Sequence, residues 1–317
     1  MSIYKGTREA FTRALIEMSE SDDRLFFVSP DSLKAMRATE FAEKYPERYI
    51  EVGIAEQNAL NVSAGLASAG LVPFVGTYGG FITMRACEQV RTFIAYPHLN
   101  VKMIAINGGL LGGEREGVTH QFFEDLGIVR SIPGITVITP ADESQVYGAV
   151  KACVNIDGPV YIRCASGREP VVYERDVPFE FGKIRILRNY GNDVAVFASG
   201  YIMNRAIEAV ENLKKEGIYA TLVDVSTLKP IDEAGIAEVL EKCRGAVTVE
   251  DHNIIGGLGS AISETAAEYC PVYIMRVGLR DIFPQSGEPN ALLDYYQIGV
   301  SDIVDRAKKV IDKKSKK

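Results

Sequence analysis

Long hydrophobic runs are absent from this sequence. Its longest apolar stretches have the length of strands, and none approaches the ~20 residues that a membrane-spanning helix requires. The segment MSIYKGTREAF at the N-terminus has no apolar core of the kind found in secretory signals. We therefore expect a cytoplasmic protein without membrane contact.

A basic excess is also lacking. The formal net charge is −7, and the one basic cluster, KKVIDKKSKK at the C-terminal end, is typical of a solvated, fraying tail. Nucleic-acid binding proteins usually carry a basic stripe or patch. We therefore expect no nucleic-acid partner.

Paired cysteines and clustered histidines are missing as well. The cysteine count is odd and no two cysteines form a C-x-x-C pair, which argues against a disulfide framework or a zinc site. The three histidines are too few and too scattered for an all-histidine metal site. We expect no metal ligands in this chain, and reduced, mostly buried thiols at Cys87, Cys153, Cys164, Cys243 and Cys270.

Strand-like and helix-like segments alternate along the 317 residues. The hydrophobic share of 47% and the charged share of 24% are those of ordinary globular protein, and the length suits two domains. Apolar faces at helical spacing predict helices over residues 7–20 and 55–69. Nearly continuous apolar runs predict buried strands at residues 24–29, 72–77, 101–107, 135–139 and 159–163. This pattern predicts an α/β domain with a mainly parallel sheet.

A break in this rhythm separates two predicted domains. Residues 165–192 contain three glycines, two prolines and many charges, which indicate a linker with a short hairpin. The predicted boundaries are a first domain at 1–170, a linker at 171–185 and a smaller, second doubly wound domain at 186–317. In the second domain we expect strands at 193–199, 219–225, 246–250 and 272–277, and helices at 202–217, 232–243, 257–269 and about 300–314.

The first candidate for chemistry is Glu56, in the segment E-V-G-I-A-E-Q-N at 51–58. It lies in the first turn of an Ala-rich predicted helix, where the helix dipole favours an acid without any special function. Small and apolar neighbours also predict burial, and a buried carboxyl group is suited to sharing a proton. The residues alone leave both interpretations open.

Two further segments are candidates for a binding site. G-T-Y-G-G-F at 76–81 follows a predicted strand and places Tyr78 and Phe81 three residues apart, either as a core pair or as a stacking platform. G-G-E-R-E-G-V-T-H-Q at 112–121 places His120 beside acids on a glycine-rich loop, which is either an ordinary turn or part of a site aimed at a ligand.

These segments resemble those of one enzyme family. V-G-I-A-E-Q-N, together with V-T-H-Q, is similar to the motifs of transketolases and of the related deoxyxylulose-phosphate synthases. The resemblance implies that Glu56 bonds to the aminopyrimidine of thiamine diphosphate and shares the proton that activates the cofactor. It also implies that Phe81 stacks on that ring, that Tyr78 lines the same pocket, and that His120 contacts hydroxyls of the donor substrate.

The sequence departs from the family pattern around the substrate. The family has G-E-D-G-x-T-H-Q, so Glu116 replaces an aspartate that contacts the acceptor, Gln121 is retained, and Arg115 is an apparent insertion. The longer acid and the inserted arginine predict a reshaped substrate channel. Gly76 replaces a serine and Tyr78 replaces a phenylalanine, but neither change removes the stacking platform.

The end of the channel that holds an anionic group is changed as well. The resemblance implies that Arg8 and Arg163 contact a sugar phosphate, because both arginines are retained. Ala35 stands near the family's serine and Asn107 replaces its histidine, so Asn107 takes a place in the substrate site. Asp31, in the segment S-P-D-S-L-K, is a further substrate-binding candidate. We expect a substrate with an anionic tail that differs from the usual sugar phosphates, such as a sulfonate or a branched sugar phosphate.

One essential motif of the family is missing. No G-D-G occurs, although the family binds the diphosphate and Mg²⁺ through G-D-G and an asparagine. The resemblance therefore implies a separate partner subunit that carries this motif, with self-association of this chain through its pyrimidine-binding domains. The expected assembly has two copies of each subunit.

Other functions remain open from the sequence. The C-terminal half, with V-D-V-S-T-L-K-P-I-D and V-E-D-H-N-I-I-G-G-L-G-S, also resembles the beta subunits of 2-oxoacid dehydrogenases. A deoxyxylulose-phosphate-synthase-like enzyme and a non-catalytic regulatory subunit are further alternatives. The preferred hypothesis is a subunit of a transketolase that transfers a two-carbon ketol unit from a ketose to an aldose.

Overall fold

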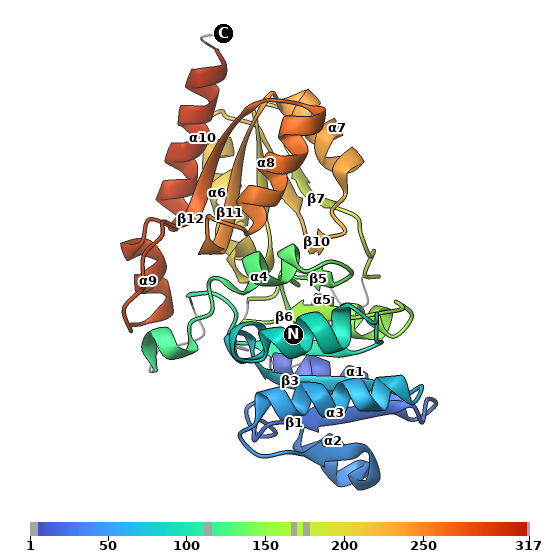
Figure 1. The fold of residues 1–317 in the computed structure, drawn as a ribbon. Coiled ribbons are helices and arrows are strands. Elements are labelled where there is room, and N and C mark those ends of the chain that lie inside the picture. Colours follow the sequence, from blue (N-terminus) through green and yellow to red (C-terminus); the bar gives the residue numbers. More distant parts are fainter. Residues whose placement is uncertain (1–5, 111–115, 166–169, 174–177, 316–317) are drawn as a thin grey trace.

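Two α/β units lie one above the other in the computed structural model, which describes residues 6–110, 116–165, 170–173 and 178–315 (Figure 1). The first unit forms the lower part of Figure 1, and the second forms the upper part with the C-terminal helix. Arg115, the apparent insertion, lies outside the described residues. The prediction of two doubly wound units with a mainly parallel first sheet is confirmed.

The first sheet has seven strands in the order β10-β5-β6-β4-β3-β1-β2. Six of them run parallel, because helical segments connect strands that enter the sheet in the same direction. These are β1 (Leu25–Ser29), β2 (Tyr49–Glu51), β3 (Val72–Tyr78), β4 (Lys102–Ile106), β5 (Thr136–Ile138) and β6 (Val160–Arg163). Five of the six were predicted from apolar runs, whereas β2 is too short and too exposed to give such a run.

Helices cover both faces of this sheet, which explains why its strands are apolar on both sides. Phe27 and Phe74 face α1 and α5, while Val28 and Val75 face the opposite layer. The helical segments on the two faces, with a short helix beyond β1, are α1 (Thr7–Ser19), α2 (Thr39–Lys44), α3 (Glu56–Ser68), the π-helices Phe81–Arg85 and Gln89–Ala95, α4 (Asp125–Ser131) and α5 (Glu143–Cys153).

The second sheet has five strands in the order β12-β11-β8-β9-β7. Its strands are β7 (Arg185–Asn189), β8 (Val194–Ala198), β9 (Ala220–Asp224), β11 (Gly245–Asn253) and β12 (Tyr273–Leu279). One face packs on α7 (Glu233–Cys243) and α8 (Leu258–Tyr269), and the other on α6 (Met203–Lys215) and α10 (Val300–Lys314), with α9 (Pro289–Tyr295) near its edge.

Two strands differ from the expectation. β7 lies in the stretch predicted as a linker with a short hairpin, but it pairs antiparallel with β9 rather than with a neighbour in sequence; residues 166–169 and 174–177 of that stretch lie outside the described residues. β10 (Thr227–Lys229) follows the second sheet's β9 in sequence but pairs antiparallel with β5 of the first sheet. The two units therefore share a sheet, and the site on the first sheet is held against the second unit.

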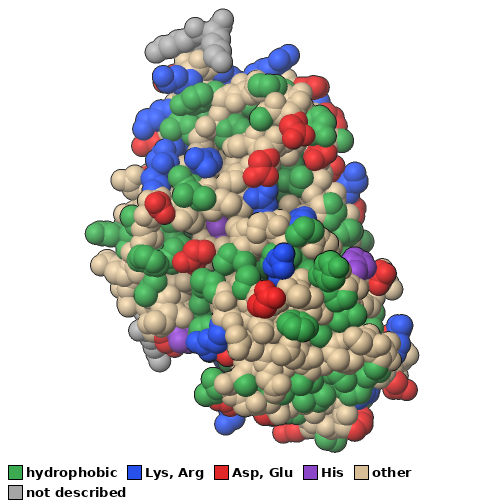
Figure 2. Space-filling model, in the orientation of Figure 1, with side chains coloured by type: hydrophobic (Ala, Val, Ile, Leu, Met, Phe, Trp, Pro, Cys, Tyr) green, Lys and Arg blue, Asp and Glu red, His purple; other side chains and the backbone are tan. Residues whose placement is uncertain are grey.

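The cysteines are mostly inside the protein, and charged side chains of both signs lie on its surface (Figure 2). Cys87 is half-buried and the other four cysteines are buried, in line with the expectation of mostly buried thiols. Within the described ranges, no helix combines the length and the apolar character needed to cross a membrane. On the face drawn in Figure 2, the coloured Lys and Arg side chains are interspersed with Asp and Glu rather than gathered in one stripe.

Candidate functional site

The candidate residues gather at the carboxyl ends of the parallel strands of the first sheet. Glu56 opens α3 shortly after β2, Tyr78 ends β3, and Asn107 follows β4. Open α/β sheets bind ligands at this edge, because the loops that leave the strands there converge. The topology thus brings together residues that are far apart in sequence.

Glu56 is an almost fully buried carboxylate that is paired with a half-exposed arginine. Its side chain is 4% exposed, and Arg85 Nη1 donates a hydrogen bond to its Oε1 over 2.8 Å. Arg85 ends the π-helix Phe81–Arg85, and its own side chain is 49% exposed. The N-terminus of α3 adds a favourable dipole for the carboxylate. The expected burial of Glu56 is therefore observed, while the arginine beside it was not anticipated.

An aromatic cluster stands next to this ion pair. Phe81 contacts Tyr78, His120 and Phe122 edge-on, with ring centroids 5.5, 5.5 and 5.4 Å away. The Arg85 guanidinium carbon lies 4.1 Å from the centroid of the Phe81 ring. Phe81, Tyr78 and His120 thus contact one another, and Arg85 links this cluster to Glu56, which lies 64 positions before His120 in the sequence.

A glycine permits this close aromatic packing. A Cβ on Gly80 would lie 2.1 Å from a ring carbon of Phe122, so any larger residue would push that ring away from Phe81. The G-G pair in G-T-Y-G-G-F therefore has a packing role that the sequence did not reveal.

The loop that carries His120 has one exposed and one buried end. Thr119 Oγ1 lies 3.0 Å from Nδ1 of His120 and donates to the carbonyl of Glu116, whose side chain is exposed. Gln121 is 1% exposed, and its amide donates to the carbonyls of Leu110 and Gln285 over 3.1 and 3.3 Å. Gln121 thus ties the loop to the second unit, a contact that sequence analysis did not foresee.

Arg8 and Asn107 are hydrogen-bonded to each other. Arg8 Nη2 donates to Asn107 Oδ1 over 2.6 Å, and Nη1 donates to the carbonyl of Ala35 over 3.1 Å. Asn107 adopts a left-handed backbone conformation with φ of 57°, which asparagine tolerates better than most residues. The Asp31 side chain is exposed, and its backbone N–H donates to Glu51 Oε1 over 2.7 Å.

Arg163 is placed differently from its expected role. It is 5% exposed, and its guanidinium donates to Asp125 over 2.9 Å, to Asp251 over 2.7 Å and to the carbonyl of Phe122 over 3.3 Å. Burial lowers the pKa of Arg163, but the two carboxylates outweigh it and the net shift is upward. A guanidinium bound on three sides in the interior fits a structural ion pair between the two units, which argues against contact with a substrate anion.

Comparison with known proteins identifies the family to which this chain belongs. The transketolase pyrimidine-binding domain matches residues 4–167, and the transketolase C-terminal domain matches residues 182–303. The chain belongs to the transketolase family. Membership implies dependence on thiamine diphosphate.

Several relatives of this transketolase-family chain are named as a section, a subunit or a split-gene protein. It is 37% identical over 308 residues to a putative transketolase C-terminal section of Methanocaldococcus jannaschii, covering 96% of each chain. It is also 37% identical to a 6-deoxy-6-sulfo-D-fructose transketolase subunit of a Clostridium species, covering 97% of this chain and 95% of that one. A solved structure titled as the inactive beta4 tetramer of a split-gene transketolase aligns with a TM-score of 0.88, 38% identity, and coverage of 97% and 98%.

The residues present fit the pyrimidine end of thiamine diphosphate. That ring is flat, and it needs a stacking surface and a carboxylate at one nitrogen. Phe81 and Glu56 already hold a flat group with N–H donors in this way, because the Arg85 guanidinium lies over the one and bonds to the other. The match concerns this end of the cofactor, since the chain has no G-D-G motif for the diphosphate.

Proposed function

We propose that this chain is the pyrimidine-binding subunit of a thiamine-diphosphate-dependent transketolase, active only with a partner subunit. The reaction is transfer of a two-carbon ketol unit from a ketose to an aldose. One observation carries the proposal: the buried carboxylate of Glu56 and the ring face of Phe81 converge on the same flat group.

The chain's own residues have distinct tasks in this proposal. Glu56 shares a proton with a pyrimidine nitrogen, which its buried position favours because water does not compete for the carboxylate. Phe81 supplies the stacking face, and Tyr78 with His120 forms the rest of the wall. When bound, thiamine diphosphate supplies the carbon nucleophile. Thr119 engages Nδ1 of His120, and we assign Nε2 to the hydroxyls of a ketose donor.

A partner subunit supplies the diphosphate and Mg²⁺ site. The missing G-D-G motif requires it, and relatives of nearly equal length are named as sections or subunits. Large apolar side chains next to Glu56 and Arg85 suit such a contact: Ile54 is 76% exposed and Met84 45% exposed. We further propose that two copies of each subunit assemble, with this chain self-associating through its pyrimidine-binding domain.

The donor carries an anionic end group in this proposal. Arg8 is the arginine that supports it, since Arg163 is bound by two carboxylates inside the protein. A relative named for a sulfonated sugar makes a sulfonate as reasonable as a phosphate. Asn107 and Glu116 would then help to distinguish the donor and acceptor from common sugar phosphates.

A donor assay tests this function. The chain is mixed with a subunit that carries G-D-G, thiamine diphosphate and Mg²⁺, and ketol transfer is measured with phosphorylated, sulfonated and uncharged ketoses. We expect transfer from an anionic donor, and we expect Arg8→Ala to raise KM for that donor about tenfold or more while changing KM for an uncharged ketose little.

Three outcomes would contradict parts of this proposal. CO₂ release from pyruvate without ketol transfer would favour a 2-oxoacid dehydrogenase subunit. If Arg8→Ala has the same KM for anionic donors as the wild type, Arg8 does not contact the substrate. Equal activity on xylulose 5-phosphate and every other donor would reject an altered specificity.

A further inference from the structure

Arg85 occupies a position that the proposed cofactor ring would need. Its guanidinium carbon lies 4.1 Å from the Phe81 ring centroid, and its Nη1 lies 2.8 Å from Glu56 Oε1. These are the two contacts that the proposed function assigns to an aminopyrimidine: stacking on Phe81 and a nitrogen at Glu56. Both groups are flat and both carry N–H donors, so the same carboxylate and the same ring accommodate either one.

The two groups compete for one carboxylate oxygen and one ring surface. Glu56 is 4% exposed at the start of α3 and has little room to turn toward a second partner. Arg85 is 49% exposed and is attached to Glu56 and Phe81 through the end of its side chain, so it is the member that can move into solvent. Rotation about its side-chain bonds is enough to clear the site, and no backbone change is required.

We propose that Arg85 is a gate on the pyrimidine site, which fills the site in the unloaded chain and swings out when the cofactor ring enters. This proposal rests on the proposed function. A buried carboxylate without a partner is costly, so a counter-charge that can leave keeps Glu56 paired until the ring replaces it. The gate also lowers cofactor affinity, because only the fraction of molecules with Arg85 displaced can bind.

Cofactor affinity of gate variants tests this proposal. The complex with the G-D-G subunit is titrated with thiamine diphosphate and Mg²⁺ by calorimetry, for the wild type, Arg85→Ala and Arg85→Lys. We expect Arg85→Ala to lower Kd about tenfold. Arg85→Lys should lie between alanine and wild type, since an ammonium still pairs with Glu56 but has no flat face to stack on Phe81.

A matched control separates the gate from a general loss of surface charge. Arg13 is also an exposed arginine in a 2.8 Å ion pair with a glutamate, Glu17, but it lies on α1 away from the site. Arg13→Ala should leave Kd unchanged. Circular dichroism checks that each variant is folded, and Arg85→Lys retains the test if the alanine variant does not assemble.

The possible results distinguish the gate from the function on which it rests. Tighter binding for Arg85→Ala, with no change for Arg13→Ala, supports the gate. Unchanged or weaker binding for both Arg85 variants, with normal binding by the wild type, overturns the gate and leaves the proposed function intact. No binding of thiamine diphosphate by the wild-type complex overturns both.

Discussion

Glu56 is placed by its position in α3 and by burial rather than by an extended hydrogen-bond network. Its carboxylate lies in the first turn of α3, is almost fully buried, and accepts a hydrogen bond from the Arg85 side chain. A carboxylate in this setting is sensitive to the group that faces it, because desolvation strengthens each remaining contact. Removing the ionisable group of Glu56 should therefore lower activity while leaving the fold intact.

Replacing Glu56 by glutamine tests that separation. Glu56→Gln keeps the size and the hydrogen-bonding capacity of the side chain but cannot share a proton, so we expect kcat of the complex to fall by ~10²–10⁴. The melting temperature of the chain should change little. Glu40→Gln is the matched control, since Glu40 also lies in the first turn of a helix, α2, but is exposed. Near wild-type turnover for Glu56→Gln would refute a proton-sharing role.

At the residue scale, local motifs were informative and long-range pairs were not. Glu56, Phe81 and His120 were selected from short segments, and the structure brings them into one cluster. The partners of Arg163 are 38 and 88 positions away, and Arg85 is 29 positions from Glu56. No spacing rule predicts such pairs, because they depend on which strands and helices become neighbours.

At the scale of elements, the linker is fixed to both units by buried carboxylates. Asp142 caps α5 by accepting from the Gln145 N–H, and it also accepts from the backbone N–H groups of Val172 and Tyr173. Tyr173 then donates its hydroxyl to Asp224 at the end of β9 over 2.5 Å. The linker is thus a docked segment rather than a free spacer.

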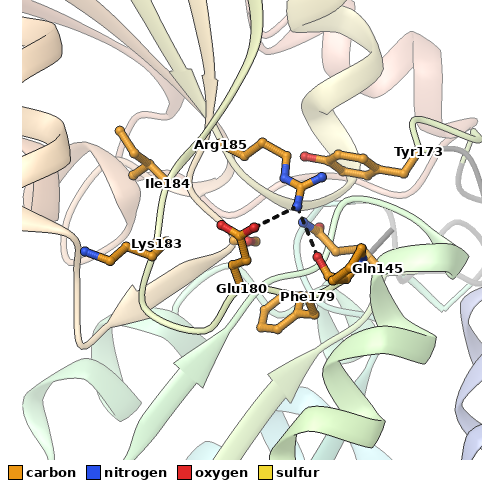
Figure 3. A pocket seen from close by; sticks show the side chains of 9 residues that line it. Gln145, Tyr173, Phe179, Glu180, Lys183, Ile184 and Arg185 are labelled. Carbon is orange, nitrogen blue, oxygen red and sulfur yellow. Dashed lines mark hydrogen bonds and ion pairs between the residues drawn. The ribbon is translucent and has the colours of Figure 1, made fainter. Parts of the chain in front are cut away.

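A pocket beside this junction shows how the linker continues into β7. Figure 3 shows Arg185 between Glu180 and the ring of Tyr173. Arg185 lies 3.7 Å from a carboxylate oxygen of Glu180, donates to the carbonyl of Pro178 over 3.1 Å, and stands 5.6 Å from the Tyr173 ring centroid. These contacts place the first residue of β7 against the linker, which explains why this strand joins the second sheet at its edge.

The junction predicts a pH dependence of stability. Burial raises the pKa of Asp224 to about 6, although hydrogen bonds from Tyr173 and Gln145 oppose the shift. The folded state therefore holds the proton more tightly than the unfolded state does, and stability falls as pH rises from about 4 to about 6. The loss approaches about 3 kcal/mol, because each pKa unit corresponds to about 1.4 kcal/mol.

Asp224→Asn isolates this dependence. Asparagine can still accept the Tyr173 hydroxyl but does not titrate, so the loss of stability between pH 4 and 6 should be smaller by about the contribution of this group. Urea unfolding at pH 4, 5, 6 and 7 measures the difference. The same pH profile for wild type and variant would show that Asp224 does not titrate in this window.

Periodicity predicted most elements but not how two short strands pair. The runs at 24–29, 72–77, 101–107, 135–139 and 159–163 are apolar because both faces of their sheet are covered, and this signal is visible in sequence. β10 spans only Thr227–Lys229, and its partner β5 lies almost 90 positions earlier. β7 has no fully buried residue and lies inside a stretch of linker composition. Their pairing is decided by tertiary packing alone.

At the scale of the whole molecule, the two units form one support for the site. Arg163 of β6 bridges Asp125 of α4 and Asp251 of β11, and β10 extends the first sheet. The backbone N–H of Asn253 also bonds to the carbonyl of Phe123. These contacts hold the His120 loop between the units, so the second unit contributes to the shape of the site without supplying Glu56 or Phe81.

In the proposed function, the residues on this support bind one end of the cofactor. The carboxylate and the stacking ring suit a pyrimidine, whereas the motif for a diphosphate and its metal is absent from the sequence. We propose that thiamine diphosphate bridges this chain and a partner. Because this proposal concerns cofactor binding, it can be tested without knowing the sugar substrates.

The most direct measurement is calorimetric titration of thiamine diphosphate with Mg²⁺ into this chain alone, and into its mixture with a subunit from a neighbouring gene that carries the G-D-G motif. We expect tight binding in the mixture and none that is measurable with either subunit alone, because neither holds both ends of the cofactor. Tight binding by this chain alone would contradict the account, since the diphosphate site would then lie within it.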